Sequence, residues 1–150
     1  MKTKTIVVEL SQEEISDLLS TACDYGDSYL GVSIKKSDYY GTELEDEEDF
    51  VCDRAAKLLL NGKSIFIRDY YAESEDEFYG NLPHRWSEKR ECMIYTITLE
   101  DVKIGIAKAL DSDEDYIKEY IYDWVKDGSF DITEAECVLQ YIVFGEVIYG

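Results

Sequence analysis

Negative charge is the feature of this sequence that most constrains what the chain can fold into. The 150 residues include 34 acidic and 15 basic residues, which gives a formal net charge of −19. The acids are spread evenly, since residues 1–75 carry 17 acids and 8 bases and residues 76–150 carry 17 acids and 7 bases. Disordered acidic chains are poor in aromatic residues, but here 13% of the residues are aromatic and 45% are hydrophobic. The sequence therefore predicts a single folded acidic domain over residues 1–150.

The charge also restricts the partners that such a domain can bind. It repels nucleic acid and anionic membranes, and it attracts basic surfaces over about one Debye length, roughly 8–10 Å in physiological salt. No apolar stretch approaches about 18 residues, so the sequence offers no candidate membrane span. We expect a protein that binds a basic protein surface and does not bind nucleic acid directly. The composition favours this class over an enzyme.

The cysteines and the single histidine do not form a metal-binding pattern. The four cysteines stand far apart without a CxxC pair, and His84 is the only histidine. Residues 1–4 lead into a strand-like segment that contains Glu9, in place of the apolar core of a signal peptide. We expect a cytoplasmic protein with no metal and no cofactor. Its cysteines are expected to be small, reduced core residues, although their spacing leaves disulfides open: Cys23, Cys52, Cys92 and Cys137.

The order of local patterns predicts an α+β domain with about five helices and a small antiparallel sheet of three to four strands. Alternating or β-branched segments predict strands at residues 3–10, 29–36, 63–70 and 92–97. Apolar residues at helical spacing predict helices at roughly 11–26, 46–61, 98–110, 111–128 and 131–145. Residues 72–90 are the longest expected loop, and they contain a basic cluster of His84, Arg85, Lys89 and Arg90. Residues 147–149 either add a short strand or pack on the core.

Helix boundaries are marked by capping residues. Ser11 with Glu14 forms a capping box, and Thr98 with Asp101 forms a looser one. Asp111 or Ser112 is expected to cap the next helix, and Asp131 or Thr133 the last one. Glycines that end helices are expected at Gly26 and Gly145.

Three acidic clusters supply the candidate partner-binding residues. The densest has six acids in the seven residues 43–49. Duplex DNA carries one charge about every 1.7 Å, so a protein that mimics it needs many carboxylates. A solvated helix start, where acids favour the helix dipole, is the alternative for residues 43–49. The candidate contacts are Glu43, Glu45, Asp46, Glu47, Glu48 and Asp49, then Glu73, Glu75, Asp76 and Glu77, then Asp111, Asp113, Glu114 and Asp115.

Other sequence patterns are weaker indications of a site. Residues 111–115 begin like a calcium loop, but Tyr116 stands where the turn needs glycine and Tyr122 where a glutamate is needed, so we predict a helix start there. Gly-rich phosphate loops, GxSxG and HExxH are absent, and we predict no catalytic residues. Several tyrosines suit a basic, partly apolar groove on a partner, or else half-bury in a small domain: Tyr25, Tyr29, Tyr39, Tyr40, Tyr70, Tyr71 and Tyr79.

Three segments carry a family resemblance. Residues 22–29 read ACDYGDSY, Thr98-Leu99-Glu100-Asp101 is followed by Gly105-Ile106, and Leu139–Gly150 reads LQYIVFGEVIYG. In the same order they resemble the motifs A-x-E-G-G-x-x-Y-W, T-L-x-D-x-x-x-G-I and L-Q-x-x-x-F-G-E-x-x-Y-G of a family of small acidic proteins encoded by bacteriophages and prophages. Asp24-Tyr25-Gly26 and Leu30 depart from the first motif. The resemblance implies a phage or mobile-element origin and no particular chemistry.

Charge and resemblance together give a functional hypothesis. The chain would be a phage-encoded inhibitor of a host defence protein, with anti-CRISPR or anti-restriction activity. It would bind the basic nucleic-acid-binding surface of that protein by DNA mimicry, in the bacterial cytoplasm. One alternative is a phage accessory protein without an inhibitory role. The other is a protein that sequesters a nucleotide signal, for which the candidate ligands are Arg54, Arg68, Arg85, Lys89 and Arg90. The sequence does not predict the oligomeric state.

Overall fold

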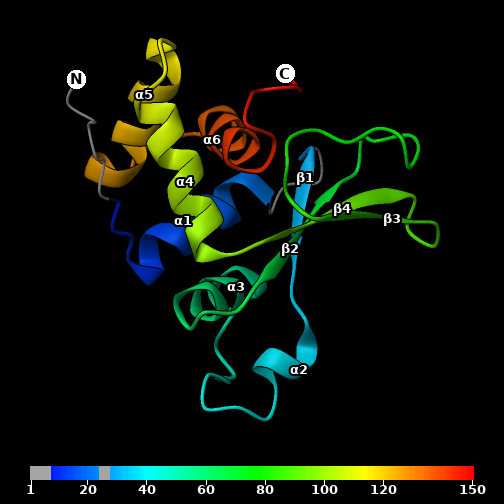
Figure 1. Ribbon diagram of the computed structural model, residues 1–150. Helices are drawn as coiled ribbons and strands as arrows, with labels where there is room; N and C mark the ends of the chain where they lie inside the picture. The colour runs from blue at the N-terminus through cyan, green and yellow to red at the C-terminus, as the bar shows by residue number, and fades with distance from the viewer. Residues whose placement is uncertain (1–7, 24–27) are drawn as a thin grey trace, which may run out of the picture.

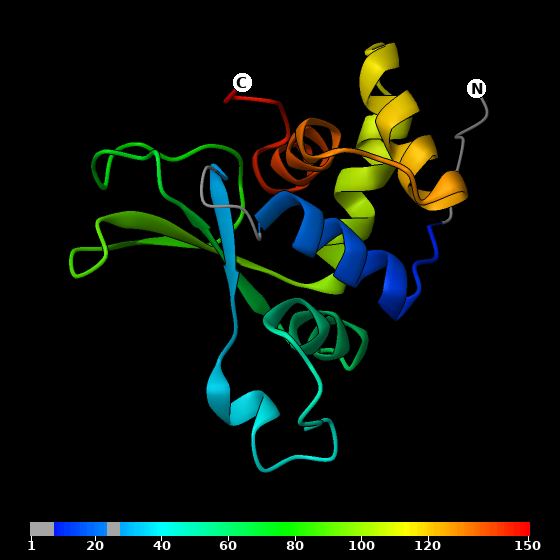
Figure 2. The same ribbon diagram turned by 180° about the vertical axis from the view of Figure 1, so that it is seen from behind.

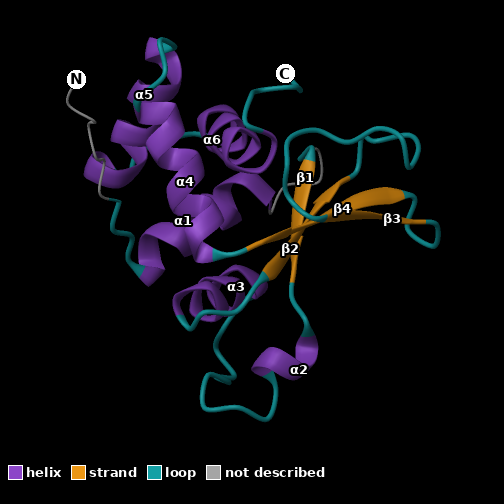
Figure 3. Ribbon diagram, viewed as in Figure 1, coloured by secondary structure: helices purple, strands orange, loops and turns teal. Residues whose placement is uncertain are grey.

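The computed structural model of this protein describes residues 8–23 and 28–150, and this part of the chain forms an α+β fold. It contains six α-helices, one π-helical turn (η1) and a four-stranded antiparallel sheet, which confirms the predicted class (Figures 1 and 3). Apart from the short helix α2, which lies below the end of β1, the helices gather on one side of the sheet in both views (Figures 1 and 2). In chain order the elements are α1 (Gln12–Cys23), β1 (Leu30–Ser33), α2 (Lys36–Tyr39), α3 (Val51–Leu60), β2 (Ile65–Asp69), β3 (His84–Ser87), β4 (Cys92–Ile97), α4 (Leu99–Leu110), α5 (Asp115–Tyr122), η1 (Asp123–Asp127) and α6 (Ile132–Phe144).

The sheet has the strand order β1-β2-β4-β3, and every neighbouring pair is antiparallel. Successive residues of β2 alternate between buried and half-buried, because successive side chains of a strand point to opposite faces. Ile65 and Ile67 belong to the main core with the helices, whereas Phe66 and Arg68 lie on the other face. The sheet therefore has one face packed against helices and one that the helices leave open.

Local capping signals position several helices as predicted. The Glu14 amide donates to Ser11 Oγ at 3.1 Å and the Ser11 amide donates to Glu14 Oε1 at 2.8 Å, which completes a capping box before α1. The Asp101 amide donates to Thr98 Oγ1 at 3.2 Å before α4. Asp131 caps α6 through the Glu134 amide, at 2.8 Å. Gly145 ends α6 with φ of 80°, a conformation that glycine adopts without strain.

Two strand predictions need correction. Of the strand expected at 3–10, residues 3–7 lie outside the described residues, and Val8–Leu10 form no strand. Val8 and Leu10 instead pack against the helical core. The loop expected at 72–90 contains β3, which pairs with β4 in the register Trp86↔Met93. The prediction missed this strand because it lies at the edge of the sheet and is short and mostly polar, with Arg85 among its four residues; short strands and charged side chains protect edges from unwanted pairing.

Two helix starts also differ from expectation. The helix expected at 46–61 begins at Val51, since residues 43–49 form turns, as when the Glu48 amide donates to Asp46 Oδ1 at 3.0 Å. The helix expected to be capped by Asp111 or Ser112 begins at Asp115, with Glu114 at the N-cap position. The Ser112 hydroxyl instead donates back to the Ala109 carbonyl at 2.7 Å. The predicted helix end at Gly26 lies outside the described residues.

The core lies between the sheet and the helices. Trp124 is buried and its Nε1 donates to the Glu14 carbonyl at 2.8 Å, which ties η1 to α1. A Cβ added to Gly105 of α4 would lie 2.8 Å from the Cα of Ile142 in α6, so these two helices pack closely because this residue is glycine. Cys52 and Cys92 are buried, whereas Cys23 and Cys137 are half-buried. Among the described residues no helix is both long and apolar enough to cross a membrane.

Candidate partner-binding site

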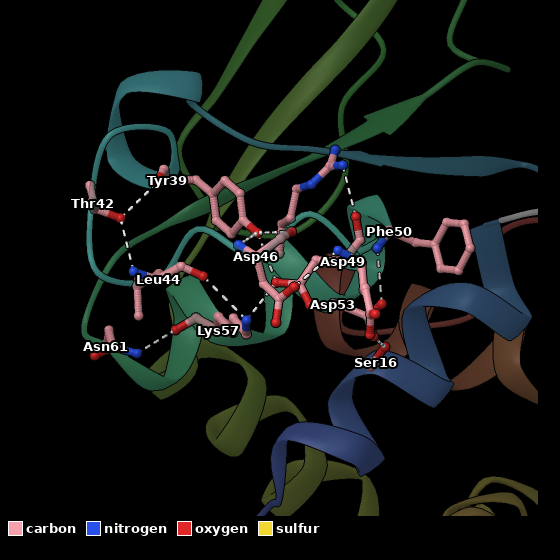
Figure 4. Close-up of polar contacts among 12 residues, drawn as sticks. Ser16, Tyr39, Thr42, Leu44, Asp46, Asp49, Phe50, Asp53, Lys57 and Asn61 are labelled. Atoms are coloured by element: carbon pink, nitrogen blue, oxygen red, sulfur yellow. Dashed lines mark hydrogen bonds and ion pairs between the residues drawn. The ribbon is translucent and has the colours of Figure 1, made fainter.

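The densest acidic cluster forms an ordered loop around a buried tyrosine. Tyr39 ends α2 and is fully buried. Its hydroxyl accepts a hydrogen bond from the Asp46 amide at 2.7 Å and lies 2.8 Å from Asp49 Oδ2, to which it can donate (Figure 4). The Asp46 carbonyl lies 3.1 Å from the same hydroxyl. One phenol therefore holds Asp46 and Asp49, and of the two alternatives for Tyr39, contact with a partner or burial in the domain, the structure shows burial.

A lysine and an arginine of α3 hold the end of the loop. Lys57 Nζ lies 2.6 Å from Asp49 Oδ2 and donates to the Leu44 carbonyl at 3.2 Å. Arg54 donates from Nη2 to the Asp49 carbonyl at 2.8 Å, and its guanidinium lies over the rings of Tyr39 and Tyr40. Two of the 15 basic residues are thus used to fix this acidic segment.

The pKa values in this network reflect those contacts. Partial burial acts to raise the pKa of Asp49, but the hydrogen bonds from Lys57 and Tyr39 outweigh burial, and the pKa lies below its usual value. The hydrogen bond with Asp49 raises the pKa of Lys57. Burial raises the pKa of the Tyr39 phenol. At neutral pH the network therefore contains a carboxylate, an ammonium group and a neutral phenol.

The loop leads directly into the start of α3. Asp53, in the first turn, accepts from the Phe50 amide at 3.0 Å through Oδ2 and from the Ser16 hydroxyl at 2.7 Å through Oδ1. These bonds tie the loop to both α3 and α1. The Phe50 side chain takes no part in them: it is 77% exposed, and Figure 4 shows its ring pointing away from the hydrogen-bonded network. An apolar ring thus stands in water beside the acidic loop.

The six acids of residues 43–49 therefore divide into two groups. Glu45, Asp46 and Asp49 hold the loop, since Glu45 Oε1 accepts from the Gly41 amide at 2.8 Å and the other two make the contacts described above. The carboxylates of the remaining three, Glu43, Glu47 and Glu48, make no such contact; five of the six acids are exposed, and Asp49 is half-buried. Tyr40 is also exposed, at 44%, so carboxylates and two aromatic rings are available to a partner here.

The other two clusters are also exposed loops. In the second, Glu77 accepts from the Glu73 amide at 2.7 Å, while Glu73, Glu75 and Asp76 are exposed. In the third, all four candidate acids are exposed, and Asp115 makes a long ion pair with Lys118 at 3.9 Å. Residues 111–115 lie at a helix start, as the alternative to a calcium loop predicted.

The three clusters lie at three different corners of the molecule. Residues 43–49 lie in the loop between α2 and α3, at the bottom of Figures 1 and 2. Residues 73–77 lie in the loop between β2 and β3, and residues 111–115 between α4 and α5, both at the opposite end. A single flat partner surface therefore cannot contact residues 43–49 together with the other two clusters.

A buried polar contact that sequence patterns did not reveal closes the C-terminal end. Gln140 of α6 is buried, and its Oε1 accepts from the amides of Ile148 and Tyr149, both at 2.8 Å. The Tyr149 phenol then donates to Asp69 Oδ2 at 2.7 Å, and Asp69 is fully buried at the end of β2. Burial raises the pKa of both groups. Ile148 and Tyr149 therefore pack on the core, and residues 147–149 add no strand.

No group of three or more His, Cys, Asp or Glu side chains that could hold a metal ion occurs within residues 8–23 and 28–150. Comparison with known proteins gave no match to this chain from any family model, any curated protein or any solved structure.

Proposed function

We propose that this chain is an inhibitor that binds the basic nucleic-acid-binding surface of a partner protein through residues 40–50. The exposed ring of Phe50 beside an acidic loop fixed by Tyr39 and Lys57 is the observation that carries the proposal. An aromatic anchor surrounded by carboxylates complements a basic groove that has an apolar floor. The resemblance to phage proteins suggests a restriction or CRISPR effector as the partner.

The order of the loop supports this role. A loop that is already held in one conformation loses less entropy when it binds, so more of the contact energy appears as affinity. The contacts of Tyr39, Arg54, Lys57 and Asp53 provide that order before any partner arrives. The exposed carboxylates of Glu43, Glu47 and Glu48 remain available for a partner's lysines and arginines.

The other two clusters contribute at long range. Because they lie at the opposite end of the molecule, we assign them to the negative field that speeds encounter with a basic partner and not to the same contact. The net charge of −19 gives that field its strength. Charge changes at the three clusters should therefore have unequal effects on the lifetime of a complex.

Capture from a bacterial lysate at low and moderate salt would identify the partner. The proposal expects a nucleic-acid-binding protein that is retained at low salt and displaced by salt or duplex DNA. A captured protein that ignores DNA, or the absence of any captured nucleic-acid-binding protein, would contradict it.

Three triple variants with the same change in net charge then test the assignment of the contact. Cluster 43–49 is changed at Glu43, Glu47 and Glu48 to Lys, which spares the acids that hold the loop. The matched variants carry Lys at Glu73, Glu75 and Asp76, or at Asp111, Asp113 and Glu114. We expect the first to raise the dissociation rate about tenfold or more, as Phe50→Ala should, and the others to change mainly the association rate. Equal effects of all three would reject residues 40–50 as the contact.

A further inference from the structure

The face of the sheet opposite the helices carries a pattern of its own. Strand alternation places Arg68 of β2 and Ile94 of β4 on this face, where they are register partners. Cys92 and Ile94 are buried, yet neither belongs to the core that the helices share with the sheet. This open face is distinct from residues 40–50, and its pattern is independent of the function proposed for that loop.

One row of residues crosses all four strands on this face. Gly31 of β1 pairs with Arg68, Arg68 pairs with Ile94, and Ile94 pairs with Arg85 of β3. Neighbouring strands are about 4.8 Å apart, so the row spans about 14 Å from Gly31 to Arg85. The two arginines stand on either side of one apolar residue.

An aromatic ring occupies the Gly31 end of the row. A Cβ added to Gly31 would lie 2.7 Å from Cε2 and 2.8 Å from Cζ of Tyr70, so the tyrosine ring lies against this glycine, on the open face. Tyr70 is 48% exposed, so part of the ring is available to a ligand. Along the row, the exposed ring of Tyr70 comes first, followed by Arg68 and then by Arg85.

Among the residues that the structure describes, Arg68 and Arg85 form no ion pair with a carboxylate, although the chain is rich in acidic residues. Within the described residues the carboxylates that lie within 4.0 Å of a basic group are those of two ion pairs, Lys57–Asp49 and Lys118–Asp115. Arg68 and Arg85 thus have no carboxylate at that distance, although the chain has 34 acids. The buried Nε of Arg68 also has no hydrogen-bond partner. Two cations held close together in this way leave room for an anion between them.

A third arginine adds to the positive charge. Arg90 lies in the turn between β3 and β4, where its amide donates to Ser87 Oγ at 3.3 Å. Burial raises the pKa of the nearby Cys92 thiol, whereas Arg68, Arg90 and Arg85 each act to lower it and Asp69, on the other face, acts to raise it. All three guanidinium groups are thus close enough to one point of the open face to act on it electrostatically.

We propose that this row binds a nucleotide, with the base stacked on Tyr70 and the phosphates held by Arg68 and Arg85. Guanidinium groups bind phosphate oxygens through two parallel hydrogen bonds, and an aromatic side chain stacks on any base. The negative charge of the rest of the molecule selects a small ligand, because its repulsion grows with each phosphate of a polynucleotide. Arg90 reinforces the phosphate end.

Calorimetry with ATP, adenosine, tripolyphosphate and a short oligodeoxyadenylate tests this assignment. We expect ATP to bind, and adenosine and tripolyphosphate to bind about tenfold more weakly or not at all, since each lacks one half of the recognition. Arg85→Gln and Arg68→Gln should each weaken ATP binding about tenfold or more, and so should Tyr70→Ala. Lys108→Gln, on α4 at the helical side, is the matched control and should leave ATP binding unchanged.

The result that overturns the proposal is equally specific. It fails if ATP does not bind at millimolar concentration, or if Arg85→Gln and Tyr70→Ala leave its binding unchanged. It also fails if tripolyphosphate binds as tightly as ATP, because the ring would then play no part. If the oligonucleotide binds more tightly than ATP and the same arginine variants weaken its binding, the ligand of this face is a nucleic acid and the proposal of a nucleotide is wrong. Arg85 and Tyr70 are exposed, so their variants decide the matter even if Arg68→Gln does not fold.

Discussion

Two aspartates of this chain have pKa values displaced in opposite directions. Asp69 is fully buried, and burial raises its pKa even though it accepts hydrogen bonds from the Tyr149 phenol and the Tyr71 amide at 2.7 and 2.9 Å. Asp49 is partly exposed and bound to Lys57 and Tyr39, so its pKa is lowered. The same type of side chain therefore links folding to pH with two different signs.

The sign for each aspartate is set by linkage between proton binding and folding. The folded chain holds the Asp69 proton more tightly than the unfolded chain, so this contribution to stability is present below the unfolded pKa and is lost as pH rises through the folded value. The Asp49 contribution is present above its unfolded pKa and is lost as pH falls through the lowered folded value.

We therefore predict opposite pH dependences for Asp69→Asn and Asp49→Asn. The free energy of unfolding of the wild type minus that of Asp69→Asn should fall as pH rises from about 4 towards 7. The corresponding difference for Asp49→Asn should fall as pH is lowered below about 4. Urea denaturation over a pH series measures both, and each variant is the control for the other. If the free energy of unfolding of the wild type minus that of Asp69→Asn rises with pH, the folded state does not bind the Asp69 proton more tightly than the unfolded state, and the prediction is wrong.

At the scale of elements, the polar side chain of Gln140 anchors the last residues of the chain to α6. This side chain replaces strand pairing for residues 148 and 149: it accepts from both amides, and its Nε2 donates to the Tyr149 carbonyl at 3.0 Å. The Tyr149 ring stacks on Tyr29 at 5.3 Å between centroids and contacts Tyr71, Tyr79 and Phe144. The C-terminal motif thus has a structural explanation: Gln140 binds the backbone, Gly145 ends the helix and Tyr149 reaches Asp69.

Gln140→Leu should destabilise the fold by about 2–4 kcal/mol, because it removes the partner of three partly buried backbone groups, the amides of Ile148 and Tyr149 and the Tyr149 carbonyl. Gln12→Leu is the matched control, since Gln12 is exposed at the start of α1 and should change the free energy of unfolding by less than about 0.5 kcal/mol. Urea denaturation measures both values. Hydrogen exchange at the amides of Ile148 and Tyr149 should accelerate only in the Gln140 variant. Equal stability of the two variants would contradict the anchoring role.

Sequence patterns locate the elements whose signals are local. The caps at Ser11, Thr98 and Asp131 need only residues three positions apart, and the three strands with a clear apolar pattern lie at the predicted positions. The strand β3 escapes prediction, because an edge strand needs little apolar surface and its short, mostly polar sequence is typical of a loop.

The candidate sites depend on contacts that no local pattern contains. Tyr39 holds the acidic loop through residues up to ten positions away, and Tyr149 reaches Asp69 across 80 positions. The arginine row requires the register of three strand pairs, so Arg68 and Arg85 could be named as basic candidates but not placed together. Exposure of the acids was predictable from their charge; which of them also hold the loop was not.

At the scale of the whole molecule, negative charge is opposed by few internal ion pairs. Two are present within the described residues, and one of them is a long contact at the surface. The remaining carboxylates repel one another in the folded state more than in the expanded unfolded chain. Salt should weaken this repulsion and equally weaken attraction to a basic partner, so stability and binding respond to salt in opposite ways.

We predict that raising NaCl from about 10 to about 100 mM, which shortens the Debye length from about 30 to about 10 Å, raises the melting temperature of the free protein by several degrees. For a chain of this length a gain of about 1 kcal/mol corresponds to roughly 2–4 °C. Differential scanning calorimetry measures the shift, and sucrose at equal osmolality controls for effects unrelated to charge. The same increase in salt should weaken the complex with a basic partner. A melting temperature that does not change with NaCl would mean that the repulsion among the 34 acids is already offset in the fold. The negative electrostatic field proposed to attract a basic partner would then be too weak for that role.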